Sequence, residues 1–250
     1  MTIFDHPKLR DEHACFASSA YAVALADKHQ ADLHVLHLTT AKELSLFDAE
    51  PIATKKVTAE ACVHHLWFDD RDYEEYGNLI KCNPAIKSQQ DRTALLKAIR
   101  NDTLDIIATD HAPHLLKEKE QHYEKAPAGI PLVQHALLIL FELVKQDELT
   151  IETLVEKTAH NPAIRFKVKD RGFIREGYFA DLVLVDMNHA TQVSNQNVFY
   201  KCQWTPFHEE EFSATIKSTW VNGIQMYSDT KGILSEPSGK ALEFERSNYS

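Results

Sequence analysis

The sequence has no long hydrophobic run and no excess of basic residues. Its longest apolar run, LLILF within residues 136–143, is far too short to cross a bilayer. The formal net charge of −10 disfavours nucleic acid as a partner, because phosphate binding needs a basic face. The start of the chain, MTIFDHPKLRDEH, is polar and charged, unlike a signal peptide. We therefore expect no membrane and no nucleic-acid partner, whereas a small anionic substrate remains compatible with this composition.

Several motifs that define common enzyme classes are also missing. The sequence has no GxSxG, no P-loop and no GxGxxG, so acyl-enzyme, nucleotide and dinucleotide chemistry lack support. Its cysteines, Cys15, Cys62, Cys82 and Cys202, form no CxxC pair, which disfavours a zinc ribbon and a disulfide framework. We expect reduced, mostly buried thiols and a cytoplasmic location.

Residues 1–165 alternate between strand and helix patterns. Ser88 can cap a helix, and Asp91 three residues later can complete a capping box. Such alternation predicts an α/β fold with parallel βαβ units. The expected strands are 32–40, 57–68 and the run that enters the loop at 110–114, and the expected helices are 12–29, 41–50, 89–101, 132–146 and 150–160.

From about residue 172 the pattern changes to short alternating strands with glycine turns. GFIREGYFADLVLVDM and ATIKSTWVNGIQMY have this character, and we expect no helix after residue 166. The sequence therefore predicts two domains, an α/β portion over residues 1–165 and a small β domain over residues 166–250.

The candidate chemical residues follow the predicted strands, at the end where a β/α barrel builds its active site. Asp110, in IATDHAPH, ends a buried run, where a carboxylate is costly unless paired, hydrogen-bonded or bound to a metal. It is either a metal ligand and proton carrier or a loop cap. His37 lies nearer its strand end than His34, and the two point to opposite faces, so they form no HxH pair. His37 is either a metal ligand or a hydrogen-bonded core histidine.

Three further positions have both a functional and a structural interpretation. The adjacent His64 and His65 alternate faces in the expected strand, so at most one reaches a site. Asn83 precedes a proline that holds it extended, and its amide can donate to and accept from a substrate or simply stabilise a turn. Gly129, in EKAPAGIP, either lets the backbone approach a ligand or is an ordinary turn glycine.

Seven segments run in order over nearly the whole chain: HVLHLTT, VTAEACVHHL, KCNPAIKSQQDR, IATDHAPH, PAGIP, HNPAIRF and GYFADLVLVD. Together they resemble the C-terminal part of a dihydroorotase of the amidohydrolase superfamily. The resemblance implies a zinc-dependent TIM-type (β/α) barrel, present here as its last strands and helices, and a small C-terminal β-sandwich domain. It also implies the reversible conversion of N-carbamoyl-L-aspartate to L-dihydroorotate, a step of pyrimidine biosynthesis.

The same resemblance implies roles for particular residues. His37 would bind one zinc ion, and Asp110 would bind the other and act as acid/base, with one or two Zn2+ in the complete enzyme. Substrate contacts would come from Asn83, His114 and the backbone of Ala128 and Gly129. This sequence departs from the family pattern at Ala128, where Phe is common, and at Lys87, where Arg is common.

Other parts of the family pattern precede the segments seen here. These are an HxH pair followed by arginine, a bridging carboxylate (an Asp or a carboxylated Lys) and one more histidine ligand. His6 and His13 do not form such a pair, and only about three of eight barrel strands are recognisable. We therefore expect the 250 residues alone to have little dihydroorotase activity and to bind zinc weakly.

Two other functions remain open. One is another cyclic amidohydrolase, such as a hydantoinase or allantoinase. The other is a non-catalytic dihydroorotase-like scaffold, for instance for aspartate transcarbamoylase. The expected partners are a small anionic substrate (carbamoyl-aspartate or dihydroorotate), further copies of the chain in a homo-oligomer, and aspartate transcarbamoylase as a candidate protein partner.

Overall fold

A computed structural model describes residues 1–245 of the chain, which form two compact units. The first unit comprises residues 1–139 and 193–210, and the second comprises residues 140–192 and the described residues from 211 onward. These units divide the chain at other positions than residue 165, and the two-domain boundary stays a prediction. Over the described residues, no helix combines the length and apolarity that a membrane span requires.

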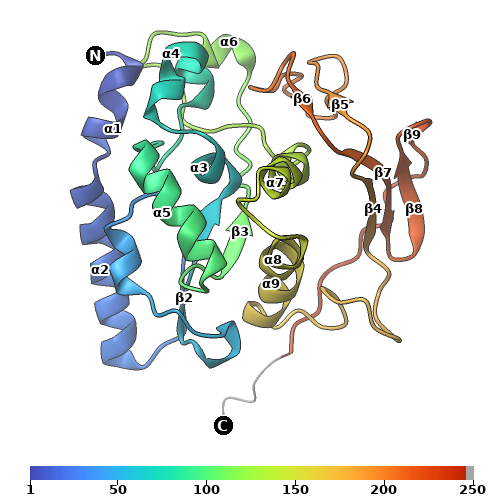
Figure 1. The fold of residues 1–250 in the computed structure, drawn as a ribbon, viewed down its shortest axis with the longest axis horizontal. Coiled ribbons are helices and arrows are strands. Elements are labelled where there is room, and N and C mark those ends of the chain that lie inside the picture. The colour runs from blue at the N-terminus through green and yellow to red at the C-terminus, as the bar shows by residue number, and fades with distance from the viewer. Residues whose placement is uncertain (246–250) are drawn as a thin grey trace. The chain divides into compact units, whose positions relative to one another are not determined.

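A three-stranded parallel sheet forms the centre of the first unit. The strands β1 (Leu33–Val35), β2 (Val57–Cys62) and β3 (Ile106–Ala108) pair in the order β1-β2-β3. Figure 1 labels β2 and β3 of this sheet. The middle strand is buried from Thr58 to Cys62, as its apolar run predicts. All three predicted strands are present but shorter than expected, and the predicted α/β class with parallel pairing is confirmed. Because the strands are parallel, their C-terminal ends lie at one edge of the sheet.

The second predicted strand was wrong at its C-terminal end. Instead of continuing to residue 68, β2 ends at Cys62 and the helix α3 (Val63–Trp67) follows. His64 and His65 therefore do not alternate faces. Both are buried, and their ring centroids lie 4.0 Å apart. Periodicity cannot separate a strand from a helix in so short an apolar run, and the tertiary fold decides between them.

Long helices were predicted better than short ones. The helices α2 (Glu12–His29) and α5 (Gln89–Arg100) have nearly their predicted bounds, and α7 (Ala136–Lys145) begins later than expected. The predicted helix over 41–50 is instead a single 3-10 turn, η2 (Glu43–Leu46), since the residue before Pro51 is held away from helical backbone. The remaining short elements are η1 (Ile3–Asp5), α1 (His6–Leu9), η3 (Ile52–Thr54), η4 (Asp70–Asp72), α4 (Tyr73–Tyr76), η5 (Gly77–Ile80), α6 (Leu116–Lys119), α8 (Ile151–Val155), the π-helical η6 (Glu156–His160) and α9 (Asn161–Arg165).

The predicted capping box at the start of α5 is confirmed. The Asp91 backbone N–H donates to Ser88 Oγ over 3.2 Å, and the Ser88 N–H donates to the Asp91 carboxylate over 3.2 Å. We expect Ser88→Ala to lower the free energy of unfolding by about 1 kcal/mol, because one helix-end donor loses its acceptor. Urea unfolding measures this. Thr93→Ala in the same helix is the control and should not destabilise the chain, since alanine is the better helix former.

A buried histidine joins two separate segments of the first unit. The side chain of His135 is 2% exposed, and its Nδ1 lies 3.2 Å from Thr205 Oγ1. Its ring packs edge-on against Tyr200 and Phe207. Burial lowers the pKa of His135 from 6.5 to about 4, so the ring is neutral near pH 7.

Acid should therefore destabilise the protein through His135. Between pH 6.5 and about 4 the unfolded chain binds a proton at this ring and the folded chain does not, so stability falls as the pH falls. The expected loss between about pH 7 and pH 4.5 is about 2 kcal/mol. Urea unfolding at both pH values should show this loss in the unaltered protein and a loss smaller by that amount in His135→Gln. Equal losses in the two proteins would contradict the assignment.

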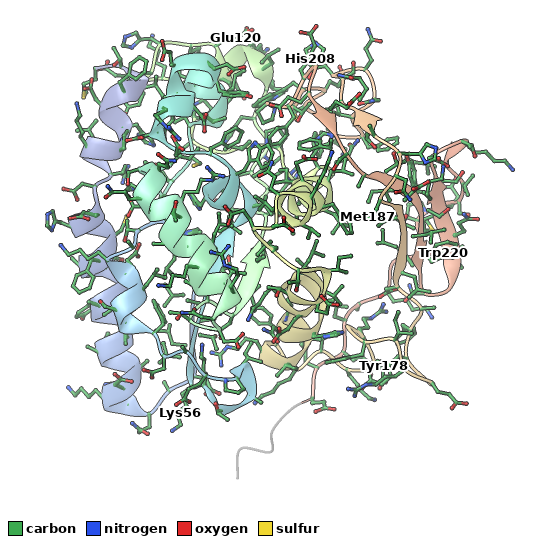
Figure 2. All side chains as sticks on the ribbon, viewed as in Figure 1. Lys56, Glu120, Tyr178, Met187, His208 and Trp220 are labelled. Atoms are coloured by element: carbon green, nitrogen blue, oxygen red, sulfur yellow. The ribbon has the colours of Figure 1, made fainter. Side chains whose placement is uncertain are left out.

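The second unit contains an antiparallel sheet. Its strands β4 (Leu182–Asp186), β7 (Thr215–Val221), β8 (Ile224–Ser228) and β9 (Gly232–Ile233) pair in this order, and β5 (Thr191–Gln192) pairs with β6 (Glu211–Phe212). Trp220 of β7, labelled in Figure 2, pairs in register with Leu182. Asn222 and Gly223 join β7 to β8 with φ angles of 52° and 81°, as a tight hairpin turn needs. As predicted, the described residues after 166 contain no helix.

Candidate active site

The residues that follow β1 and β3 share an unusual backbone conformation. His37 lies two residues after β1 and has a φ of 43°, and Asp110 lies two residues after β3 and has a φ of 44°. Aspartate and histidine enter this left-handed region more readily than most residues other than glycine, and eight further non-glycine residues in the described part of the chain also have a positive φ. The backbone conformation alone therefore does not mark a site. The two residues chosen from sequence as metal ligands do follow β1 and β3 at the same spacing, at the same edge of the sheet.

Asp110 and His37 also interact electrostatically. Partial burial raises the pKa of the Asp110 carboxyl above its ordinary value, and the nearby His37 opposes this increase. Asp110 remains exposed to solvent, and His37 is half-buried. A carboxyl with a raised pKa, in reach of water, can accept and return a proton more readily than an ordinary aspartate.

The residues fit zinc as two members of a ligand set. Imidazole nitrogen and carboxylate oxygen are both common zinc ligands, and His37 and Asp110 offer one of each. A tetrahedral site needs four ligands, of which a catalytic site takes three from protein. The pair could therefore hold a metal only together with further ligands.

His34 and His37 do not share a strand, since β1 ends at Val35 and His37 follows it, so the predicted alternation of faces does not apply to them. His34 lies on β1 and contacts side chains of β2, with its Nδ1 2.8 Å from Thr58 Oγ1 and its Nε2 3.0 Å from the Glu60 carboxylate. His34 therefore stabilises the pairing of the two strands. His6, which lies in α1 rather than in a strand, is likewise structural, because its Nε2 donates to the Cys82 carbonyl over 2.8 Å.

The structure brings together three of the predicted substrate residues. The His114 ring donates from Nε2 to the Ala128 carbonyl over 3.1 Å. Gly129 has a φ of 142°, and a Cβ there would lie 2.5 Å from the Ala112 carbonyl oxygen. Only glycine fits at this approach between the 110–114 loop and the 126–130 loop. The Gly129 N–H donates to the Lys81 carbonyl over 2.9 Å, which leaves the Ala128 backbone as the better candidate for a ligand contact.

Asn83 lies in a different loop from the other candidates. It is exposed, and its peptide bond to Pro84 is cis. The carbonyls on either side are fixed, since Cys82 accepts from His6 and Pro84 accepts from His65 Nε2 over 3.2 Å. The loop therefore presents the Asn83 amide to solvent on a braced backbone.

Lys119 is a residue that sequence reasoning missed. Its side chain is fully buried, and its Nζ donates to the carbonyls of Lys81, Pro127 and Gly129 over 2.9, 3.0 and 2.8 Å. Burial lowers the pKa of Lys119 to about 7, while the three carbonyls favour its charged form. A lysine within a polar stretch is usually predicted to lie on the surface, so no local sequence signal indicates that Lys119 is buried. Lys119 fixes the loop that carries Ala128 and Gly129.

Replacement of Lys119 should loosen that loop. We expect Lys119→Met to lower the free energy of unfolding by about 2–3 kcal/mol, because buried carbonyls lose their donor. Lys117→Met, at an exposed position of the same helix, is the matched control and should change it by less than about 0.5 kcal/mol. Equal effects of the two substitutions in urea unfolding would show that the three hydrogen bonds do not stabilise the loop.

A cleft of about 790 Å3 opens beside His114 within the first unit. Its lining includes His111, Glu118, Gln134 and Tyr200. The His111 ring accepts at Nδ1 from the Leu132 and Val133 N–H groups. It is thereby held as part of the cleft wall, so His111 has a structural role and His114 is the histidine nearer the candidate substrate loop.

Comparison with known proteins agrees with this arrangement. The amidohydrolase family model matches residues 9–226. A dihydroorotase of Methanosphaera stadtmanae is 35% identical over 191 residues, which cover 76% of this chain and 44% of that protein. The chain thus spans about half the length of the curated relatives it matches.

Solved structures show the same fold. A D-hydantoinase from Thermus sp. superposes with a TM-score of 0.88 at 20% identity, over 98% of this chain and 55% of that one. An inactive dihydroorotase-like domain of the Chaetomium thermophilum CAD-like multifunctional protein gives a TM-score of 0.66 at 19% identity, over 88% and 58% of the two chains. The protein belongs to the amidohydrolase family and corresponds to part of a dihydroorotase-like chain.

Proposed function

We propose that this chain forms part of a zinc-dependent cyclic amidohydrolase of the dihydroorotase type. The reaction is the reversible conversion of N-carbamoyl-L-aspartate to L-dihydroorotate in pyrimidine biosynthesis. The observation that carries the proposal is that His37 and Asp110 follow β1 and β3 at one edge of the parallel sheet, near enough for His37 to lower the pKa of the Asp110 carboxyl. The dihydroorotases among its relatives support the choice of reaction.

The proposal extends to the architecture. The three parallel strands would be the last strands of a β/α barrel, since the C-terminal ends of barrel strands carry catalytic residues. The antiparallel sheet would belong to a small β-sandwich. The domains would then be residues 1–165 and 166–250.

His37 and Asp110 would contribute two of the ligands for zinc. When bound, zinc lowers the pKa of a coordinated water towards 7 and polarises the amide carbonyl. Asp110 accepts the proton of the water that attacks the ring amide carbon. It then returns this proton to the ring nitrogen as the carbon–nitrogen bond breaks. The raised pKa of its carboxyl suits both steps.

Substrate would be held by Asn83, His114 and the backbone of Ala128 and Gly129. The exposed Asn83 amide can donate to and accept from the substrate. The Ala128 carbonyl accepts from His114 and retains a second lone pair. A loop fixed by Lys119 would present these groups without reordering, which lowers the entropic cost of binding.

The 250 residues alone should turn over little substrate and bind zinc only weakly through His37 and Asp110, because two ligands cannot close a catalytic site. The test is an assay of the purified chain with dihydroorotate and with carbamoyl-aspartate, in the presence of Zn2+. Robust turnover would refute this part of the proposal. The same assay with hydantoin in place of dihydroorotate tests for a hydantoinase. This alternative stays open because Ala128 stands where Phe is common in dihydroorotases.

A second candidate function is a non-catalytic scaffold. One structural relative is an inactive dihydroorotase-like domain, and this is the reason to consider a scaffold. Such a protein would assemble with copies of itself or with aspartate transcarbamoylase, and light scattering with and without that enzyme tests both assemblies. The presence of His37, Asp110, Asn83 and His114 argues against it, because a scaffold has no need of these side chains.

A further inference from the structure

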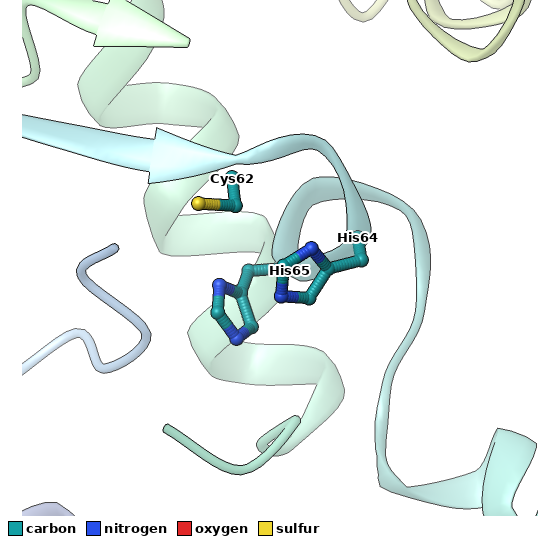
Figure 3. Close-up of side chains that lie close together, drawn as sticks. All are labelled: Cys62, His64 and His65. Carbon is teal, nitrogen blue, oxygen red and sulfur yellow. The ribbon is translucent and has the colours of Figure 1, made fainter. Parts of the chain in front are cut away.

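A second group of metal-binding side chains lies at the end of β2. Cys62 is the last residue of this strand, and His64 and His65 lie in the first turn of α3 (Figure 3). One ligand atom from each, the Cys62 Sγ and a ring nitrogen of each histidine, lie within 4.8 Å of one another. All three side chains are buried. None of them is His37 or Asp110, although His37 acts electrostatically on both histidines and Asp110 acts on Cys62.

The nitrogen atoms of this cluster lack partners. Among the described residues, three buried ring nitrogens of this cluster make no hydrogen bond by distance and angle. They are both nitrogens of His64 and the Nδ1 of His65. A buried polar group left in this way costs about 1–3 kcal/mol, and native structures seldom keep several together without a reason. A bound cation would remove part of the cost, because it would accept one electron pair from each ring. The second nitrogen of His64 carries the proton, and the Thr109 backbone is the group near enough to accept it.

The hydrogen bond of His65 fixes which of its nitrogens can bind a metal. Its Nε2 donates to the Pro84 carbonyl over 3.2 Å. The proton is therefore on Nε2, and the lone pair is on the unpartnered Nδ1. Metal-binding histidines in proteins are oriented in this way by a carbonyl on the opposite nitrogen.

The protonation states also suit a metal. Burial lowers the pKa of His64 to about 3, with His37 adding to the effect and the nearby Thr109 backbone opposing it. Burial likewise lowers the pKa of His65 well below 6.5, so both rings are neutral ligands at pH 7. Burial raises the pKa of the Cys62 thiol. Binding would therefore form a sulfur–metal bond and release the thiol proton to solvent.

We propose that Cys62, His64 and His65 form a binding site for a thiophilic cation of the Zn2+ type, separate from the His37 and Asp110 pair. One sulfur and two imidazole nitrogens favour Zn2+ or Cu+ over Mg2+ or Ca2+, which prefer oxygen. Zinc–sulfur and zinc–nitrogen bonds of about 2.3 and 2.0 Å need only a small closing movement of side chains already this near. The site stands whether or not the protein is a dihydroorotase.

Zinc titration of the purified, metal-free chain at about pH 8 tests the site, with Co2+ as a spectroscopic probe. We expect one tightly bound equivalent and a thiolate-to-cobalt charge-transfer band. Cys62→Ser should abolish the band and weaken binding at least about tenfold. Cys202→Ser is the matched control, and the double variant His37→Ala with Asp110→Asn separates the two sites. Both should keep the band.

Three results would overturn the proposal. They are a chain that binds no equivalent, a band that survives Cys62→Ser, and a band that disappears in the double variant. If Cys62→Ser does not fold, X-ray absorption of the zinc-loaded, unaltered chain decides. One sulfur at about 2.3 Å with two nitrogen ligands supports the site, and a shell of nitrogen and oxygen alone refutes it.

Discussion

Replacement of Asp110 by asparagine is expected to reduce kcat/KM for dihydroorotate by about 10³-fold or more. Asparagine keeps the shape of the side chain but cannot accept the proton of the attacking water, and it is a poorer metal ligand. The pKa of the carboxyl is already raised by burial, as suits an acid/base. The measurement is steady-state turnover in both directions by an active assembly that contains this chain.

Asp32→Asn is the matched control for that experiment, because it removes the same charge from an exposed position outside the site. It should leave kcat/KM within about twofold. A loss below about tenfold in Asp110→Asn would rule out Asp110 as the acid/base. If no assembly containing the chain is active, but Asp110→Asn still assembles with its partners as the unaltered chain does, the scaffold function gains support.

Substitution of Gly129 by valine is expected to lower the free energy of unfolding by about 4 kcal/mol. One part of the cost is conformational, since a φ of 142° is accessible almost only to glycine. The other part is overlap, because the added Cβ would lie 2.5 Å from the Ala112 carbonyl oxygen and 3.0 Å from the His114 ring. Urea unfolding of the purified chain measures the sum.

Two other glycines separate these causes. Gly223 has a φ of 81° but open space around a would-be Cβ, so Gly223→Val should cost only the conformational part, about 1–2 kcal/mol. Gly239 has neither a positive φ nor a close neighbour, so Gly239→Val should be almost neutral. If Gly129→Val and Gly223→Val are equally destabilising, the close approach to Ala112 does not contribute.

Local signals explain what was predictable about the fold. The helices α2 and α5 are long, and α5 carries its own capping box, so their bounds depend little on the rest of the protein. The turn from β2 into α3 has no such signal. CVHHLW has no capping residue, glycine or proline to mark a helix start, and its length does not separate a strand from a helix, so residues 63–67 are helical because of their tertiary surroundings. The expected strand at His64 and His65 was wrong for this reason.

The candidate site was predictable in its residue types but not in its geometry. IATDHAPH marks Asp110 as a candidate, and the strand pattern marks His37. No sequence pattern reveals that both have left-handed backbone, since aspartate and histidine are enriched in this region but most of them lie outside it. Lys119 was missed because its three acceptors lie at residues 81, 127 and 129, and such contacts exist only once the chain has folded.

The left-handed backbone of His37 and Asp110 makes glycine the more stable residue at both positions, whereas the proposed activity needs their side chains. Glycine at either position would relieve about 1 kcal/mol of strain and make the fold more stable. It would also remove a side chain that the proposed function needs for metal binding. Stability alone therefore favours glycine at both positions, and under the proposed function a lineage that loses the reaction should drift toward glycine there first.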